Sequence, residues 1–166
     1  MSKIIIVDSK DSFITFKERD DIVLDDCYRV SALWIENSKG EILLAQRAFT
    51  KKNGPGLWWP AVAWTVEEWE DYEKNMYKEA QEEIWLSGIM FELWPKEIFH
   101  WKHQYFCQWY FCILDRDITQ FQLQTEEVED IQWVSKKELI ENIRLYPQLY
   151  TISMTQSLFL KSKIDS

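Results

Sequence analysis

Residues 64–86 read WTVEEWEDYEKNMYKEAQEEIWL, and this stretch decides the fold. Asp71 is a good helix N-cap, and no Gly or Pro interrupts the residues that follow it. Apolar side chains then recur every four residues, at Tyr72, Met76, Ala80 and Ile84. The spacing therefore predicts a helix from Asp71 to about Ile84, with one face buried.

Carboxylates crowd the polar side of this predicted helix. Glu79, Glu82 and Glu83 stand at positions i, i+3 and i+4, which predicts that all three project from one side within a few ångströms. One interpretation is a solvated face of an acidic helix. The other is a site for a hard divalent cation, because Mg²⁺ and Mn²⁺ prefer carboxylate oxygens and offset their repulsion.

The spacing around the helix favours the second interpretation. Trp64 is followed after five residues by Glu70, and after seven more by Lys78-Glu79-Ala, one residue, Glu82-Glu83, one residue, Trp-Leu86. This resembles the Nudix box, Gly-x5-Glu-x7-Arg-Glu-U-x-Glu-Glu-x-Gly-U, in which U is a bulky aliphatic residue. Segments outside the box resemble the same family, over roughly residues 27 to 145: Glu41–Arg47, Pro55–Trp58, Ile131–Ser135 and Lys137–Leu139.

The resemblance implies an α/β (α+β) fold, a Nudix-type α/β/α sandwich with a mixed sheet, in a single domain over residues 1–166. The hydrophobic pattern agrees with strands that alternate with helices. The predicted strands are Ile4–Val7, Phe13–Phe16, Cys27–Glu36, Glu41–Arg47 and Ile131–Val134, with an extended run at Trp58–Val66 and one or two strands within Ile98–Leu114. Further helices are expected from Ser135 to about Ile143 and from Thr151 or Ser153 onward.

Nudix proteins cleave a pyrophosphate that joins a nucleoside to another moiety, and the resemblance assigns roles to residues of this chain. Glu79, Glu82 and Glu83 are the expected ligands of Mg²⁺ or Mn²⁺, together with the backbone carbonyl of Ala63. Glu79 and Glu82 are also assigned to catalysis. Such an enzyme acts on a small-molecule nucleoside diphosphate derivative.

Three further roles lie outside the metal set. Glu70 is expected to orient the helix through Lys78, without touching metal. Glu127, in the acidic run before Trp133, is the chosen catalytic acid or base, although a solvated acidic loop explains that run nearly as well. Two basic residues are expected to contact substrate phosphates, with an exposed structural loop as the alternative: Arg47 and Lys51. His100 and His103 stand three apart in a strand-like run, so they are expected on opposite faces, which disfavours joint metal binding.

The box departs from the family pattern at its glycines. Trp64 and Trp85 replace glycine, Trp69 stands where a Gly-Glu pair is common, and Lys78 replaces arginine. The whole chain holds 10 Trp but 4 Gly. Two explanations remain open: a diverged box with impaired turnover, or a gene whose UGA codons encode glycine but have been read as tryptophan.

Charge and composition exclude other classes of protein. The net charge of −9 at a sequence pI near 4.8 argues against capture of a nucleic acid polymer or an anionic membrane. Without a predicted signal peptide or membrane span, a cytoplasmic location is expected. The thiols are expected to be buried and free: Cys27, Cys107 and Cys112. A homodimer is left open.

Two other functions stay in view. A nucleotide-binding or sensor protein with an impaired Nudix fold is favoured by Trp64 and Trp85, whereas the retained acids favour an enzyme. Two segments, Asp21–Arg47 and Pro55–Trp58, also resemble relatives of isopentenyl-diphosphate isomerase. That isomerase needs a reactive cysteine shortly after the position of Trp58, and the chain has none in residues 60–63.

Overall fold

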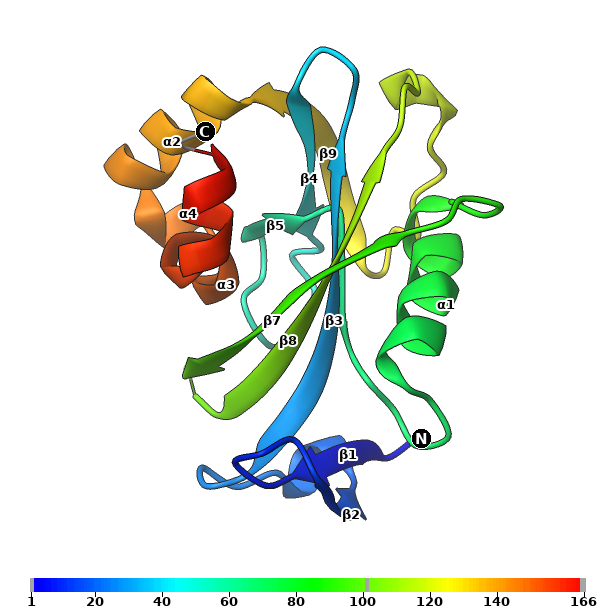
Figure 1. Ribbon diagram of the computed structural model, residues 1–166, viewed down its shortest axis with the longest axis vertical. Coiled ribbons are helices and arrows are strands. Elements are labelled where there is room, and N and C mark those ends of the chain that lie inside the picture. The colour runs from blue at the N-terminus through cyan, green and yellow to red at the C-terminus, as the bar shows by residue number, and fades with distance from the viewer. Residues whose placement is uncertain (1, 101, 165–166) are drawn as a thin grey trace.

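The computed structural model describes residues 2–100 and 102–164, and these build a nine-stranded mixed sheet with helices on both sides (Figure 1). The strands are β1 (Ile4–Val7), β2 (Phe13–Lys17), β3 (Cys27–Glu36), β4 (Glu41–Arg47), β5 (Trp58–Pro60), β6 (Val62–Thr65), β7 (Glu92–His100), β8 (Gln104–Ile113) and β9 (Val128–Ser135). The α-helices are α1 (Tyr72–Ile84), α2 (Lys136–Leu145), α3 (Ile152–Gln156) and α4 (Leu158–Ile164). Helix α1 covers one face and α2, α3 and α4 cover the other, which confirms the predicted sandwich (Figure 1).

Strand β3 is the centre of the sheet. It runs parallel to β8 and antiparallel to β1, β4 and β6, so the sheet is mixed as predicted. β4 pairs with β3 next to their shared turn, where Glu36 faces Ile42. It also pairs with β9 along its whole length and with β5 over Leu44–Gln46. The strands that pair with β3 and those that pair with β4 form two groups that diverge from this turn. The candidate functional site lies between them.

The turn between β3 and β4 shows why the predicted hairpin forms. Asn37 N–H donates to the Glu41 carbonyl at 2.9 Å, and Gly40 N–H donates to the Asn37 carbonyl at 2.9 Å. Gly40 has φ +78°, a left-handed conformation that glycine adopts without steric cost. The polar turn therefore fixes the register of two strands whose other side chains are mostly buried.

Helix α1 begins and ends where the sequence predicts. The Asp71 carboxylate accepts a hydrogen bond from Lys74 N–H at 2.8 Å, and Met76, Ala80 and Ile84 are fully buried against the sheet. The helix ends at Trp85, which is left-handed at φ 55° and ψ 43° and donates its backbone N–H to the Ala80 carbonyl. This conformation turns the chain away from α1 at the box position where the family has glycine.

Three predicted boundaries were wrong. The aromatic run forms two antiparallel strands of a hairpin, β7 and β8, and β7 already begins at Glu92. The closing strand β9 begins at Val128, inside the acidic run, because its backbone pairs along the whole length of β4. The last helical segment is two helices, since Ser157 breaks it and its hydroxyl accepts the N–H of Leu160 at 2.9 Å.

Within residues 2–100 and 102–164, no helix is both long enough and apolar enough to cross a bilayer.

Candidate active site

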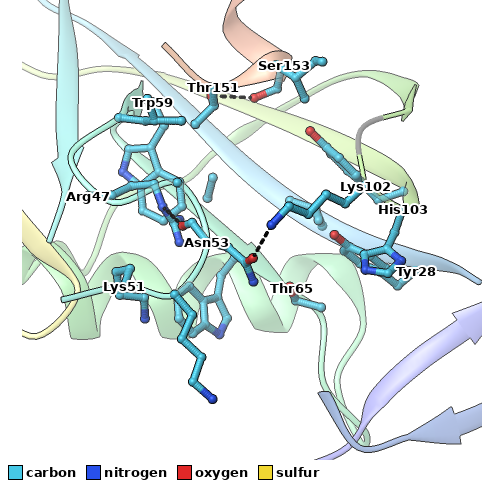
Figure 2. A pocket seen from close by; sticks show the side chains of 18 of the residues that line it. Tyr28, Arg47, Lys51, Asn53, Trp59, Thr65, Lys102, His103, Thr151 and Ser153 are labelled. Atoms are coloured by element: carbon cyan, nitrogen blue, oxygen red, sulfur yellow. Dashed lines mark hydrogen bonds between the residues drawn. The ribbon is translucent and has the colours of Figure 1, made fainter. Parts of the chain in front are cut away.

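A cavity of about 850 Å³ opens between the strands that pair with β3 and those that pair with β4. Its walls come from β3, β4 and β6, from the loop at residues 50–57, from the turn between β7 and β8, and from the segment at residues 147–155. Figure 2 shows Arg47, Lys51 and Trp59 on one side and Tyr28 and His103 on the other. Such a volume suits a ligand of nucleotide size or larger.

Two of the three α1 carboxylates face the protein interior. Glu79 is 4% exposed and Glu83 is fully buried, whereas Glu82 is exposed to solvent. Their spacing keeps all three on one side of α1, but they differ in burial. Successive helical residues are rotated by about 100°, so Glu79 and Glu83 lie close to the buried stripe and Glu82 falls on its solvent flank.

Glu83 is buried without a hydrogen-bond partner for either carboxylate oxygen. Burial raises the pKa of this carboxyl well above its usual range, and the charges of Glu79 and Glu127 add to the increase. Arg47 and Lys51 act in the opposite direction on that pKa but do not cancel it. A buried, unpartnered carboxylate surrounded by other acids is a poor structural element and a good ligand for a hard cation.

Lys78, in the middle of α1, connects the helix to the loop before it. Its Nζ lies 2.7 Å from Glu70 Oε1, 2.9 Å from Glu79 Oε1 and 3.6 Å from Glu67 Oε2. Glu70 also accepts hydrogen bonds from Glu67 N–H at 3.0 Å and from Asn75 Nδ2 at 2.9 Å. Lysine therefore retains the pairing with Glu70 that the box needs.

Burial raises the pKa of Glu79 to about 7, although the Lys78 ammonium beside it acts to lower it. The carboxylates of Glu70 and Glu79 raise the pKa of Lys78, although its partial burial acts to lower that pKa. Near neutral pH, Glu79 is therefore poised between its neutral and ionised forms, which suits either proton transfer or metal binding.

Ala63 and Trp64 lie side by side on β6 and both line the cavity. Their backbones pair with Ala32 and Ser31 of β3. The Trp64 indole lies between two cations, with Lys51 Nζ 4.7 Å from its ring centroid and the Arg19 guanidinium carbon 5.2 Å away. The indole therefore occupies space in the cavity where the family pattern has a glycine.

Arg47, Lys51 and Glu127 meet on the wall next to α1. The Arg47 guanidinium carbon lies 4.1 Å from the Trp59 ring centroid, and its Nε donates to the Asn53 carbonyl at 3.1 Å. Lys51 Nζ forms an ion pair with Glu127 Oε2. The structure thus brings these three predicted site residues to one cavity, although they are up to 80 residues apart in the chain.

Among the residues that the structure describes, no three His, Cys, Asp or Glu side chains converge at metal-binding distance. Two of the predicted site acids are paired with lysines instead: Glu79 with Lys78, and Glu127 with Lys51. Neither carboxylate oxygen of the buried Glu83 has a hydrogen-bond partner.

His100 and His103 lie on different elements, because the strand-like run breaks between them. His100 ends β7 and is exposed, whereas His103 stands in the turn before β8 and lines the cavity. His103 Nδ1 lies 3.1 Å from the Val23 carbonyl oxygen. Their placement on opposite faces of one strand was therefore wrong.

The predicted thiols are free and buried in the structure: Cys27, Cys107 and Cys112. Cys107 lines the cavity but is 1% exposed, and burial raises its pKa well above the usual thiol range. It therefore has the properties of a core thiol, and not those of a reactive thiolate.

Sequence reasoning missed two walls of the cavity, those built by Tyr28 and by the segment at residues 147–155. Both lie far from the box in the chain. A signal for the first exists in hindsight: β3 and β8 are both strongly apolar strands, and their parallel register sets Tyr28 beside Tyr105.

Comparison with known proteins agrees with this geometry. Residues 27–154 match a protein family described as the NUDIX domain. The chain belongs to the Nudix family. Because the match covers most of the chain, the resemblance drawn from the box is confirmed for the fold as a whole.

The Nudix relatives of this chain are distant. An uncharacterized Nudix hydrolase of Listeria monocytogenes is 32% identical over 108 residues, which are 63% of this chain and 62% of that protein. The match thus spans less than two thirds of the relative's length.

Solved structures show the same Nudix fold. The Deinococcus radiodurans protein DR0079 superposes with a TM-score of 0.78 at 18% identity, over 93% of this chain and 95% of its own. The NUDIX domain of Shewanella oneidensis NrtR, solved in complex with ADP ribose, superposes with a TM-score of 0.59 at 14% identity, over 80% and 90%. Identities this low bear on the fold and not on the substrate.

Proposed function

We propose that this Nudix protein is a metal-dependent hydrolase that cleaves the pyrophosphate linkage of a nucleoside diphosphate joined to another moiety. The observation that carries the proposal is Glu83, a fully buried carboxylate with no hydrogen-bond partner. Glu83 does not itself line the cavity, but Arg47 and Lys51 on the cavity wall are near enough for their charges to act on its pKa. Retaining an unpaired buried acid costs stability, so it indicates a ligand that the acid binds.

The cation would be Mg²⁺ or Mn²⁺, held by Glu79, Glu82, Glu83 and the Ala63 carbonyl. When bound, such an ion screens the diphosphate, lowers the pKa of bound water and stabilises the leaving oxygen. Glu79 would exchange its contact with Lys78 for the ion, and Glu82 would reach in from the solvent flank of α1.

The remaining site residues bind the substrate phosphates, act on the attacking water or position α1. Arg47 and Lys51 supply positive charge for the substrate phosphates from the wall next to α1. Glu127 would act on the attacking water once a phosphate takes its place beside Lys51. Lys78 and Glu70 hold the start of α1 in place and do not touch substrate. ADP ribose, which the Shewanella domain binds, is an example of the proposed substrate class.

One observation favours a second function. The Trp64 indole lies inside the cavity between Arg19 and Lys51. A protein with this ring in place is suited to bind a nucleotide without turning it over, as a sensor does. Retention of Glu79 and Glu83 in the interior favours the hydrolase, since a binding protein gains nothing from their repulsion.

The test is a panel of nucleoside diphosphate sugars and dinucleotides incubated with Mg²⁺ or Mn²⁺, with products resolved by chromatography. Glu82→Gln and Glu83→Gln should each lower turnover at least about a hundredfold. Glu129→Gln is the matched control, because Glu129 is an exposed acid on β9. Product formation that survives both α1 substitutions would refute the metal site. Nucleotide binding without turnover in all four proteins would favour the sensor.

A further inference from the structure

The side of the cavity opposite Arg47, Lys51 and Trp59 has an aromatic wall (Figure 2). Tyr28 stands near the start of β3 and Tyr105 near the start of β8, and both line the cavity. Because β3 and β8 run parallel with Tyr28 opposite Tyr105, the two side chains leave the sheet on the same face. Their rings stack, with centroids 5.7 Å apart and planes inclined by 18°.

This wall is fixed in position by its neighbours. Tyr105 is 8% exposed and packs against Phe99 at a centroid distance of 5.5 Å, whereas Tyr28 is half-buried and contributes to the cavity surface. The His103 ring borders Tyr28 at 6.4 Å and 60°, and its bond to the Val23 carbonyl ties the β7–β8 turn to the chain before β3. Tyr28 therefore presents a pre-organised ring, which binds a flat ligand at little entropic cost.

The ring is neutral and shares the cavity with hydroxyl groups. Burial raises the pKa of the Tyr28 phenol, and the positive charges of Arg19 and Arg47 only partly offset the increase, so the phenol stays protonated. Hydroxyl groups of Thr65, Thr151 and Ser153 line the same cavity, and the last two lie 3.1 Å apart (Figure 2). A cavity that offers both an aromatic face and hydroxyls suits a base attached to a ribose.

The two sides of the cavity differ in chemistry. Arg47, Lys51 and Glu127 lie on the side whose charges act on Glu83 of α1, and Tyr28 and His103 lie on the other side, as Figure 2 shows for the four of these that it labels. A nucleoside diphosphate derivative has the same two parts, a charged diphosphate and a flat base. The orientation that matches them places the diphosphate against α1 and the base against Tyr28.

We infer that Tyr28, supported by Tyr105 and bordered by His103, is a stacking subsite for the nucleobase of the substrate. This inference rests on the proposed function for the identity of the ligand, but the subsite itself is independent of metal and turnover. It predicts that the nucleoside side of the substrate is recognised and that the group beyond the diphosphate lies elsewhere.

The experiment measures binding and not catalysis. Isothermal titration of 5′-AMP and of ribose 5-phosphate, in metal-free buffer, separates the base from the sugar phosphate. Tyr28→Ala should weaken AMP binding about tenfold and change ribose 5-phosphate binding less than about twofold. Tyr28→Phe, which keeps the ring, should bind AMP like the unsubstituted chain. Tyr146→Ala is the matched control, since Tyr146 is 50% exposed and lies outside the cavity lining.

The outcomes are distinguishable from those of the hydrolase test. AMP binding that is equal in the unsubstituted chain, Tyr28→Ala and Tyr146→Ala overturns the subsite, as does the absence of AMP binding to the unsubstituted chain at millimolar concentration. If Tyr28→Ala weakens the binding of AMP and of ribose 5-phosphate equally, the subsite is also overturned. Tyr28-dependent AMP binding in a protein that cleaves no diphosphate supports the subsite and refutes only the hydrolase.

Discussion

Replacing Trp85 tests whether the end of α1 is built for glycine. Trp85 has φ 55° and ψ 43°. In this left-handed conformation a Cβ approaches the following carbonyl oxygen, which costs a residue other than glycine roughly 1–2 kcal/mol. The indole is 58% exposed, so part of its contact surface is lost on truncation and must be separated from the backbone effect.

Comparing Trp85→Gly with Trp85→Ala makes that separation, because both lose the indole and only alanine keeps the Cβ. Glycine in ordinary helical backbone is less stable than alanine by about 1 kcal/mol. At position 85 we expect the reverse sign, with the glycine variant more stable by about 1 kcal/mol. For a domain of this size, the melting temperature should rise by about 2–4 °C from Ala to Gly.

Urea unfolding of the two variants, followed by far-UV circular dichroism, gives the difference in the free energy of unfolding. The control pair is Gln81→Ala and Gln81→Gly, within the same helix and without the left-handed backbone. There the glycine variant should be the less stable by about 1 kcal/mol. A glycine variant at 85 that is less stable than its alanine partner would refute the reasoning.

Three further outcomes are expected. In metal-free buffer with chelator, Glu79→Gln should be more stable than the unsubstituted chain by roughly 3 kcal/mol at pH 8 and nearly equal to it at pH 4. The reason is that the pKa of Glu79 is raised from 4.5 to about 7, so the unsubstituted chain loses stability as the pH rises through that window. Urea-unfolding profiles that stay parallel against pH for the two proteins would contradict this. Trp64→Gly should raise turnover of a diphosphate substrate about tenfold or more by removing the indole from the cavity, while Trp69→Gly, 84% exposed and outside the cavity lining, should leave the rate unchanged. Mass spectrometry of the protein purified from its native cell should show glycine at 64, 69 and 85 if UGA encodes glycine there; UGG codons at these three positions would exclude that explanation.

The backbone bears on the two explanations of the tryptophans. Trp69 has φ 71° and Trp85 has φ 55°, and apart from Asp11 they are the non-glycine residues with positive φ among those described. Both are also exposed, so neither indole repays its backbone strain by burial. This is the pattern expected where the fold requires glycine, whereas Trp64 lies on a strand and affects the cavity through its side chain.

Local sequence predicted the parts of the fold that depend on local chemistry. Asp71 and the four-residue apolar spacing specified where α1 begins and roughly where it ends, and the Asn37–Gly40 turn specified the hairpin, since capping and turn formation involve neighbours in the chain. The β7 boundary was missed because its register is set by pairing with β8. Likewise, β9 extends to Val128 because β4 supplies its partners.

The box spacing, read in the sequence alone, determined the family and named the acids of α1. Only the tertiary structure decided which of these acids are buried, that Lys78 and Lys51 hold Glu79 and Glu127, and that Glu83 has no partner. The physical reason is that burial and pairing depend on side chains brought together across the sheet. The stack of Tyr28 on Tyr105 is of the same kind, since 77 residues of chain separate two rings that one parallel register sets side by side.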